Sequence, residues 1–467
     1  MEELIKKNEK SSQKISRRDF ITKSSAAAAA FMIVPRYVLG GPGYTAPSDK
    51  INIAAIGVGG KGRSDIAAVA TENIVALCDV DDIKMFDTIK RAGEWAEEKG
   101  LSENPLTKVP RYKDFREMLD KQKDIDAVTV STPDHFHAVA AITAIKQGKH
   151  AFVQKPLTYS VDEAQKLSAA AKKAGVVTQM GNQGHAGEGI RLIGEWLKDD
   201  AIGEVREVHC WTNRPIWDTG MNRPAEIPSV PPTLDWNQWI GPAPFRPYHP
   251  DYAPWSWRAW CDFGTGALGD MGAHIFDIPY HTLKMDHPTS VFASSSKFNG
   301  ESWPVASTIY YEFPQRGSLP PVKLTWYDGG IMPPRPEGIE PGRRMGDGDG
   351  GIMFYGDKGM IMCGCYGRNP RLVPETSMKE YQRPPKTLPR SPGIHEEWVQ
   401  CIKESKQASS NFDYAARLTS TMLLGNIAIR MAPRSTKLEW DGIAGKFTNM
   451  DEANDYLGRE YRDGWNL

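Results

Sequence analysis

The spacing of apolar residues divides most of the chain into two regions. From Ile51 onward, short continuous apolar runs alternate with helix-like stretches, as expected for parallel strands covered by helices on both faces. Later strands are longer and alternate between apolar and polar positions, for example at 205–211 and 307–313, a period typical of a mixed or antiparallel sheet with one covered face. The pattern predicts an α/β protein, with a doubly wound parallel sheet over residues 47–174 and a second α/β domain over residues 175–467.

Two further patterns complete the prediction for the second domain. Helical periodicity returns at 395–402 and at 414–431. The stretch from 329 to 351 is rich in Gly, Pro and Arg, which predicts a long surface loop.

The first strand runs into a glycine-rich turn that predicts a nucleotide site. The apolar segment 51–56 is followed by Gly57-Val58-Gly59-Gly60-Lys61-Gly62, a helix-like stretch, and a second strand at 74–78 that ends on Asp79. Glycines let the backbone approach a pyrophosphate, whose charge then lies against the N–H groups of the helix start. Asp79 lies where a carboxylate accepts hydrogen bonds from the adenosine ribose, which favours NAD over NADP because a 2′-phosphate is repelled. A glycine-rich turn alone is often structural, but the order strand, turn, helix, strand and acid indicates a Rossmann-type domain.

Two later strands are expected to end at the same site. The buried strand at 126–131 is followed by Thr132-Pro133-Asp134, and the strand at 150–153 by Gln154-Lys155-Pro156. Ligands of such sheets lie beyond the carboxyl ends of the strands, so residues 131–137 should face the cofactor. The residues predicted to hold the nucleotide are Gly57, Val58, Gly59, Gly60, Lys61, Gly62, Arg63, Asp79, Ser131, Thr132, Pro133, Asp134, His137, Gln154 and Lys155.

Three residues are candidates for hydride-transfer chemistry. Hydride leaves a carbinol carbon only as the hydroxyl proton is taken, so the site needs a base and a donor to the oxygen. Asp270 and His274 are four positions apart and are expected to share a helix face, where the carboxylate could fix the imidazole tautomer. Asp277 and His281 are expected to continue this face. Lys155 follows a strand of the cofactor sheet, and its amine could stabilise a developing alkoxide. For Asp270 and His274, the alternative is a polar helix face with an incidental hydrogen bond. For Lys155, the alternative is a solvated surface lysine.

Substrate contacts are expected from two segments. Asn182, Gln183 and His185 follow a strand and carry amide and imidazole groups suited to sugar hydroxyls. Five tryptophans lie between 236 and 260, and of this group Trp257 and Arg258 are the candidates for stacking and hydroxyl or carboxylate binding. Core packing or a subunit interface is the alternative for any single tryptophan. The group favours a carbohydrate over a small aliphatic alcohol.

The N-terminus predicts export. Arg17-Arg18 precedes a short apolar run at 26–34, which is far below the roughly 20 residues that span a bilayer. Residues 1–46 are therefore expected to be a twin-arginine-type signal and linker, and such signals move folded proteins to the periplasm. Cleavage is expected between Gly40 and Asp49, with no membrane anchoring afterwards. Folded export allows a nucleotide to be acquired first, so we expect NAD to be tightly bound and recycled by a second substrate.

Charge and cysteine spacing argue against several classes of partner and site. The formal net charge is −1, which gives no electrostatic case for nucleic acid or anionic membranes as partners. The six cysteines have neither zinc spacing nor a disulfide framework and are expected to be structural.

After the signal, nearly the whole chain resembles the Gfo/Idh/MocA oxidoreductases, which include glucose–fructose oxidoreductase and inositol dehydrogenases. The landmarks are Gly57–Gly62, the segment 132–137, Lys155-Pro156, Gly264–Asp277 and the segment 354–359. The resemblance implies a Rossmann domain with an open-faced C-terminal α/β domain, a dimer or tetramer, and oxidation or reduction of sugars or polyols with NAD(P). It also implies that Lys155, Asp270 and His274 are catalytic.

The chain departs from the family pattern at two positions. Gln154 stands where Glu usually precedes the Lys-Pro pair, and Asp134 stands where Asn is usual. Gln154 removes a charge near Lys155, so the electrostatics of this lysine should differ from the family norm.

Three functions remain as hypotheses. The first is an exported NAD-dependent oxidoreductase acting on a secondary hydroxyl of a sugar, glycoside or polyol. The second is a glycosidase that uses transient NAD oxidation, elimination and return of the hydride. The third is a non-catalytic sugar-binding protein, against which the presence of Lys155, Asp270 and His274 argues.

Overall fold

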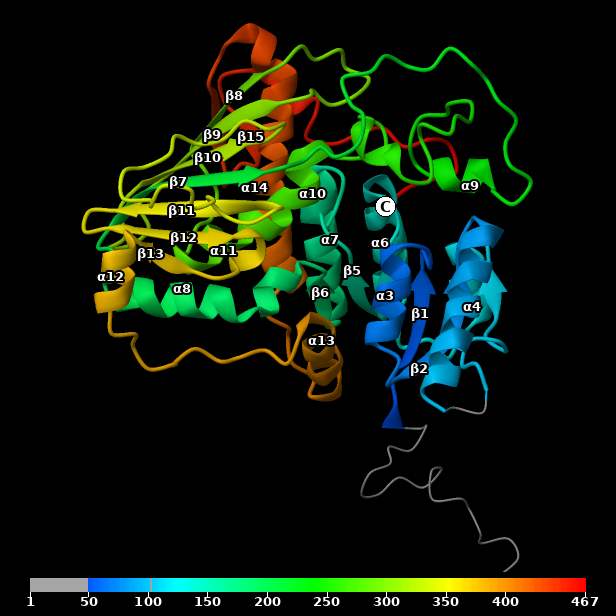
Figure 1. Ribbon diagram of the computed structural model, residues 1–467. Coiled ribbons are helices and arrows are strands. Elements are labelled where there is room, and N and C mark those ends of the chain that lie inside the picture. Colours follow the sequence, from blue (N-terminus) through cyan, green and yellow to red (C-terminus); the bar gives the residue numbers. More distant parts are fainter. Residues whose placement is uncertain (1–48, 101–102) are drawn as a thin grey trace, which may run out of the picture. The chain divides into compact units, whose positions relative to one another are not determined.

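The computed structural model describes residues 49–100 and 103–467 (Figure 1). The predicted export signal, residues 1–46, lies outside the described residues. From Asn52 to Leu467 the chain forms one compact unit that contains two sheets.

The first sheet has six strands, and every pair of neighbours is parallel. The spatial order β3-β2-β1-β4-β5-β6 confirms the doubly wound prediction. The strands are β1 (Asn52–Ile56), β2 (Asn73–Cys78), β3 (Arg111–Tyr112), β4 (Ala127–Val130), β5 (His150–Val153) and β6 (Thr178–Met180). Because β6 pairs with β5, the sheet extends beyond residue 174, and the predicted boundary is a few residues too early.

Helices connect these strands, and their ends follow from local sequence. Helix α7, for example, begins with a capping box in which Ser160 and Glu163 bind each other's backbone N–H, and it ends at Gly175 in the left-handed conformation. The helices of this domain are α3 (Lys61–Ala68), α4 (Asp82–Glu98), α5 (Phe115–Lys121), α6 (His137–Lys146) and α7 (Val161–Ala174), with a 3₁₀ turn, η2 (Asp134–Phe136), before α6.

The second sheet has nine strands in the order β13-β12-β11-β7-β10-β9-β8-β14-β15. Strands β7 and β10 are parallel and the other neighbours are antiparallel, so the predicted mixed sheet is confirmed. The strands are β7 (Val205–Thr212), β8 (Ser290–Ser295), β9 (Ser307–Phe313), β10 (Val322–Tyr327), β11 (Gly350–Gly356), β12 (Met360–Gly364), β13 (Arg371–Val373), β14 (Leu438–Asp441) and β15 (Lys446–Phe447). The long loop between β10 and β11 agrees with the Gly-, Pro- and Arg-rich sequence there.

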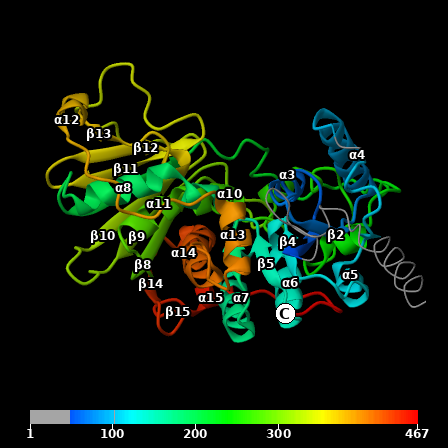
Figure 2. The ribbon, with the colours of Figure 1, turned by 90° about the horizontal axis from the view of Figure 1, so that it is seen from below.

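Helix α14 (Phe412–Met431) lies between the two sheets (Figures 1 and 2) and contacts both α7 and β8. Most of its residues are buried, as expected for a helix that is apolar on nearly all sides. The other helices after β6 are α8 (Glu188–Lys198), α9 (Trp236–Ile240), α10 (Gly266–Ile275), α11 (Asp277–Thr282), α12 (Glu375–Glu380), α13 (Ile394–Lys403) and α15 (Asp451–Asn454), with 3₁₀ turns η3 (Gln183–Ala186), η4 (Ser256–Ala259), η5 (Cys365–Gly367) and η6 (Ala432–Arg434).

The last residues return to the nucleotide domain. Arg459 donates to the buried carboxylate of Glu163 in α7, with Nε 2.9 Å from the oxygen. The Trp465 ring lies 5.3 Å from the Phe136 ring beside α6. Residues 175–467 therefore do not form a wholly separate domain, because their end completes the packing of the first sheet.

All six cysteines are free thiols, and five of them are buried, consistent with a structural role. Within the described part of the chain, no helix combines the length and apolarity that crossing a bilayer requires.

Candidate active site

The turn after β1 has the geometry that the glycine pattern predicts. Gly57 has φ +79°, and a Cβ on it would lie 2.8 Å from the Ser131 carbonyl oxygen. A Cβ on Gly62 would lie only 1.9 Å from the Gly57 carbonyl oxygen, so a side chain there would force the turn away from α3. Gly62 therefore serves the close approach of helix to strand, as the third glycine of this motif does.

Asp79, at the end of β2, is bound to the same turn. Its carboxylate accepts the backbone N–H groups of Val58 at 2.8 Å and Gly59 at 3.3 Å. Burial raises the pKa of Asp79, although these N–H groups act in the opposite direction. The carboxylate lines a cleft of about 640 Å³ at the carboxyl ends of the strands.

Most of the predicted nucleotide residues line this cleft. They are Gly57, Gly59, Gly60, Lys61, Asp79, Ser131, Thr132, Pro133, Asp134, Gln154 and Lys155. Thr132 also carries a buried hydroxyl with no hydrogen-bond partner among the described residues, which a bound ligand could satisfy. The shape of the turn, the acid and this free hydroxyl fit an NAD molecule.

Four predicted nucleotide residues do not line the cleft. Val58 and Gly62 are buried beneath the turn, where they act through packing. The Arg63 side chain is directed to the Thr88 hydroxyl, 3.4 Å away. The His137 ring lies between the carbonyl oxygens of Thr132 and Pro156 and so holds loops rather than a ligand.

The unusual Gln154 has a partner that explains its presence. Its amide nitrogen donates to both carboxylate oxygens of the fully buried Asp65, at 2.9 and 3.1 Å. Ser131 and His395 also bind this carboxylate, at 2.8 and 2.9 Å, and Lys61 forms an ion pair with it. Burial alone would raise the pKa of Asp65, but His395 and Lys61 outweigh it, and the pKa is lowered. A glutamate at 154 would place a second carboxylate against an ionised one.

Asp270 is surrounded by three cations. The Lys155 ammonium lies 2.8 Å from its carboxylate, and the guanidinium groups of Arg258 and Arg214 lie at 3.2 and 3.5 Å. Burial alone would raise the pKa of Asp270, but Lys155, Arg258 and Arg214 lower it well below its usual range. Lys155 precedes a cis peptide bond to Pro156, as expected. Lys155 and Asp270 thus come together from different domains.

His274 lies one turn after Asp270 on α10 but is not hydrogen-bonded to it. Its Nδ1 has no partner among the described residues, because the Asp270 carboxylate is engaged by the three cations. The expectation that Asp270 fixes the imidazole tautomer is therefore wrong. Burial, reinforced by the charge on Lys155, lowers the pKa of His274 well below its ordinary value. The imidazole is neutral, and its ring lies 4.5 Å from the Tyr366 ring.

Asp277 and His281 do not continue the face of α10, because α10 ends at Ile275 and both residues belong to α11. Asp277 instead accepts from His185 at 2.9 Å and from the Tyr414 hydroxyl at 2.7 Å. His185, predicted to bind substrate, is therefore tied into a buried network. Only 1% of the surface of His185 is exposed.

Of the other predicted substrate residues, some line the nucleotide cleft and others are buried in the protein. Trp257 and Arg258 line the nucleotide cleft, together with the exposed Trp255. The Arg258 guanidinium lies 4.2 Å from the Trp257 ring and 5.0 Å from the Trp255 ring. Asn182 is buried and accepts from the Ser410 hydroxyl. Gln183 has a buried side-chain nitrogen with no partner among the described residues.

Most of the five tryptophans between 236 and 260 belong to the hydrophobic core, which was the alternative to a substrate contact. Trp236, Trp239 and Trp260 pack with Tyr252 and Phe263 in one buried cluster. Only part of the group, Trp239, Trp255 and Trp257, reaches the cleft.

Four site residues were not found from the sequence: Asp65, Arg214, Tyr366 and His395. Arg214 lies in a loop after β7, 56 positions before Asp270, and no local pattern marks it. Tyr366 has φ +63°, a left-handed conformation that is unusual for an aromatic residue.

Two family models match the chain. One, described as the oxidoreductase family NAD-binding Rossmann fold, matches residues 51–182, and its partner, the C-terminal α/β domain of the same family, matches residues 204–313. Together they cover just over half of the chain, in the order and on the two sheets described above. The chain belongs to the Gfo/Idh/MocA oxidoreductase family. The predicted fold and NAD-binding domain are confirmed at this level.

Curated relatives match over parts of their length. A glycosyl hydrolase family 109 protein of Solibacter usitatus is 34% identical over 124 residues, which are 26% of this chain and 27% of that protein. A levoglucosan dehydrogenase of Pseudarthrobacter phenanthrenivorans is 26% identical over 166 residues, 35% of this chain and 34% of that protein. The chain thus matches between about a quarter and a third of the length of these two relatives.

The fold extends further than the sequence similarity. The structure of a levoglucosan dehydrogenase in complex with NADH and L-sorbose covers 83% of this chain and 98% of its own, with a TM-score of 0.52 and 18% identity. At this identity the likeness concerns the Gfo/Idh/MocA fold alone.

Proposed function

We propose that the protein is an NAD-dependent oxidoreductase that transfers hydride between nicotinamide and a secondary hydroxyl of a sugar, glycoside or polyol. The observation that carries this proposal is the cluster at the end of β5. There the Lys155 ammonium is held by the partly buried Asp270 carboxylate, and its charge helps to lower the pKa of the buried His274 imidazole on the same helix as Asp270.

The residues have complementary roles in this reaction. When bound, NAD supplies the hydride acceptor. Because its pKa is lowered, the His274 ring keeps one nitrogen unprotonated at neutral pH, so it can accept the hydroxyl proton. Lys155 donates a hydrogen bond to the substrate oxygen and stabilises its developing negative charge. The Asp270 carboxylate accepts a hydrogen bond from the lysine amine and holds it in place.

The substrate class follows from the walls of the cleft. The exposed Trp255 offers an indole face that can stack on the C–H face of a sugar ring, and Arg258, which lies 4.2 Å from the buried Trp257 ring, offers donors for hydroxyl groups. The name of the levoglucosan dehydrogenase relative supports a sugar substrate. The Asp79 carboxylate in the cleft favours NAD over NADP.

A second candidate is a glycosidase that oxidises a sugar hydroxyl transiently, eliminates the glycosidic substituent and returns the hydride. The similarity to a glycosyl hydrolase family 109 protein favours it. It would use the same nucleotide cleft and the same cluster of Lys155, Asp270 and His274.

One experiment tests both candidates. The purified protein is incubated with a panel of aryl glycosides while the nicotinamide absorbance and aglycone release are followed together. Net reduction of the cofactor supports the oxidoreductase, and release without net reduction supports the glycosidase. Silence across the panel with bound NAD would leave a non-catalytic sugar-binding protein and would contradict both.

We further propose that residues 1–46 direct export of the folded protein to the periplasm with NAD already bound, and that the mature protein forms a dimer or tetramer. The paired Arg17 and Arg18 before a short apolar run support the export route. Cell fractionation should find the protein in the periplasm, and substitution of both arginines by lysine should retain it in the cytoplasm. Native mass spectrometry of the exported protein tests the bound nucleotide and the number of subunits.

A further inference from the structure

We propose that a second cavity, beside the active site and lined by arginines, binds an anionic substituent of the substrate: a carboxylate, sulfate or phosphate on a sugar unit beyond the reacting ring. The inference rests on the proposed sugar chemistry, since it extends the same substrate. It names the substrate class as acidic glycans or glycosides.

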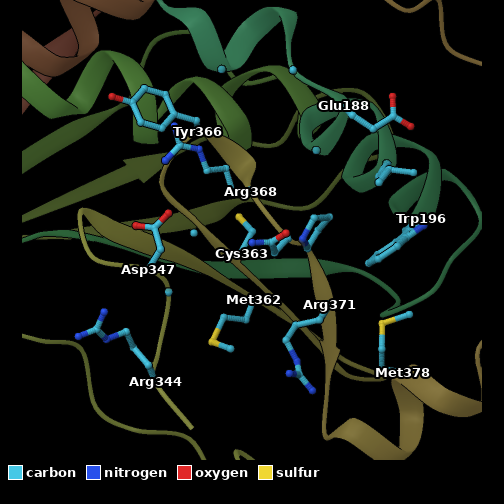
Figure 3. Close-up of a pocket in the computed structure, with 18 of the residues that line it drawn as sticks. Glu188, Trp196, Arg344, Asp347, Met362, Cys363, Tyr366, Arg368, Arg371 and Met378 are labelled. Atoms are coloured by element: carbon cyan, nitrogen blue, oxygen red, sulfur yellow. The ribbon is translucent and has the colours of Figure 1, made fainter.

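The cavity has a volume of about 1000 Å³, the upper end of the range for small-molecule sites (Figure 3). Helix α8 forms one wall, and β12, β13 and the loop before β11 form the others. Five arginines and three acids lie among its lining residues, which leaves an excess of two positive charges. They are Arg343, Arg344, Arg368, Arg371, Arg383, Glu188, Asp347 and Glu375.

Two of the arginines are already neutralised. Arg371 forms an ion pair with Glu375, and Arg343 lies 3.3 Å from the same carboxylate and 2.6 Å from Glu340. These four side chains balance one another in charge. Arg343, Arg371 and Glu375 line the cavity, and their ion pairs make these two arginines less available to an anion than the other three.

The other three arginines have no carboxylate partner. Within residues 49–100 and 103–467, no acidic oxygen lies at ion-pair distance from Arg344, Arg368 or Arg383. Arg368 and Arg383 instead lie over aromatic rings, those of Tyr366 at 4.5 Å and Trp196 at 5.6 Å. Figure 3 shows Arg344 and Arg368 at different sides of the cavity. A planar guanidinium matches carboxylate, sulfate and phosphate oxygens with two parallel hydrogen bonds.

The remaining acids do not cancel these charges. Glu188 is held by Arg390 at 3.0 Å and Lys386 at 2.8 Å, on its own side of the cavity. One oxygen of Asp347 accepts the backbone N–H groups of Asp349 and Gly350, and the other is buried with no partner among the described residues. Such an oxygen can accept a hydrogen bond from a sugar hydroxyl beside the anionic group.

The cavity adjoins the catalytic cluster through Tyr366. This residue lines the cavity, and its ring lies 4.5 Å from the His274 ring. Gln183 also lines the cavity and has a buried side-chain nitrogen without a partner among the described residues. A glycan with its reacting ring at His274 that extends past Tyr366 would reach this cavity, where Gln183 offers an amide donor and Arg368 a guanidinium.

Isolated surface arginines are usually solvated and contribute little. Here three unpaired guanidinium groups surround one cavity that also holds a buried free donor and a buried free acceptor. Because the three arginines are exposed, we expect binding of an anion to weaken as salt screens them.

The test measures binding to the full-length protein without turnover. Glucose, glucuronate, glucose 6-sulfate and glucose 6-phosphate are titrated by saturation-transfer NMR at constant ionic strength. The charged sugars should bind, and the one that binds most tightly identifies the anion. Substituting Arg344, Arg368 and Arg383 together by glutamine should weaken this binding at least about tenfold, the effect of losing a charge-assisted hydrogen bond. Glucose should bind more weakly than any charged sugar.

The matched control replaces three exposed arginines elsewhere, Arg206, Arg417 and Arg434, by glutamine and should bind as the wild type does. A variant with lysine at the three cavity positions keeps the charge and should bind more tightly than the glutamine variant. Equal binding of glucose and the charged sugars, undiminished binding in the glutamine variant, or equal loss in the lysine and glutamine variants would overturn the proposal.

A failure of this proposal can be distinguished from a failure of the proposed function. A protein that binds the charged sugars through the cavity but reduces no NAD with any glycoside would retain the cavity assignment and lose the redox assignment. Cofactor reduction without selective binding of charged sugars would retain the redox assignment and contradict the cavity assignment.

Discussion

Replacing Gln154 with glutamate would test why this chain departs from its family at that position. The substitution changes an amide that donates to Asp65 into a carboxylate at the same place, about 3 Å from the carboxylate oxygens. At that separation two unit charges repel by about 5 to 6 kcal/mol at an effective dielectric constant of about 20. Asp65 stays ionised because its pKa is lowered, so the new glutamate is the group that responds.

Proton uptake limits the loss of stability. Protonating a carboxyl with an ordinary pKa of about 4.3 costs about 3.7 kcal/mol at about pH 7 and about 1 kcal/mol at about pH 5. Once protonated, the new carboxyl donates its O–H to Asp65 and restores the hydrogen bond. The ammonium group of Lys61 and the hydrogen bond from His395 offset part of the repulsion. We therefore expect Gln154→Glu to lower the free energy of unfolding by about 2 to 3.5 kcal/mol at about pH 7 and by about 1 kcal/mol or less at about pH 5.

The sign follows from proton linkage. The folded-state pKa of the new glutamate is raised above its unfolded value, so the folded protein binds more protons between the two values. The destabilisation is present at neutral pH and is lost as the pH falls toward the unfolded pKa. Urea unfolding of the wild type and the variant at the two pH values measures it.

Two comparisons make the test specific. Gln122 donates to Asp124 in the same way at an exposed position, so Gln122→Glu should change stability by less than about 0.5 kcal/mol. The double variant Asp65→Asn, Gln154→Glu restores one carboxylate and one amide and should recover at least half of the loss. Equal stability of Gln154→Glu and wild type at neutral pH, or the same loss at both pH values, would refute the reasoning.

Three further predictions concern the catalytic cluster. Lys155→Ala or His274→Ala should cut turnover severely while leaving NAD affinity nearly intact, as measured by steady-state kinetics and calorimetry; wild-type turnover in either would remove that residue from the mechanism. Because burial lowers the pKa of His274, the acid limb of kcat/KM should lie below about pH 6.5, and an imidazole-like limb at or above that value would contradict a neutral base. Asp270→Asn leaves three partly buried cations without their carboxylate and should lower the free energy of unfolding by about 3 kcal/mol in urea titrations, with Asp413→Asn on the surface as the control that changes little.

The helices and strands could be predicted from the sequence, but the contacts between residues far apart in the chain could not. Strand β9 was predicted at its observed bounds because its alternation of apolar and polar residues is regular. The glycine turn and Asp79 were found because their spacing is a local signal. Asp65 and His395, by contrast, are 330 positions apart, and nothing in either segment indicates that they meet.

The expected pairing of Asp270 with His274 failed for a related physical reason. Their spacing places both on one turn of helix, and local reasoning joins a carboxylate to the nearest imidazole. In the folded protein Lys155 arrives from the other domain and Arg214 from a distant loop, and full charges attract the carboxylate more strongly than a neutral ring does. The partners of the Asp270 carboxylate are therefore determined by tertiary contacts and not by its spacing from His274 along the helix.

The return of residues 459–465 to the nucleotide domain has a consequence for how that domain is made and used. Without Arg459, the carboxylate of Glu163 would be left buried in α7 with no cation, and without Trp465 the Phe136 ring would lose its cover. The dinucleotide-binding half reaches its full set of contacts only after these residues have been synthesised. It is therefore not a module that could be cut out and transplanted to another protein with its stability intact.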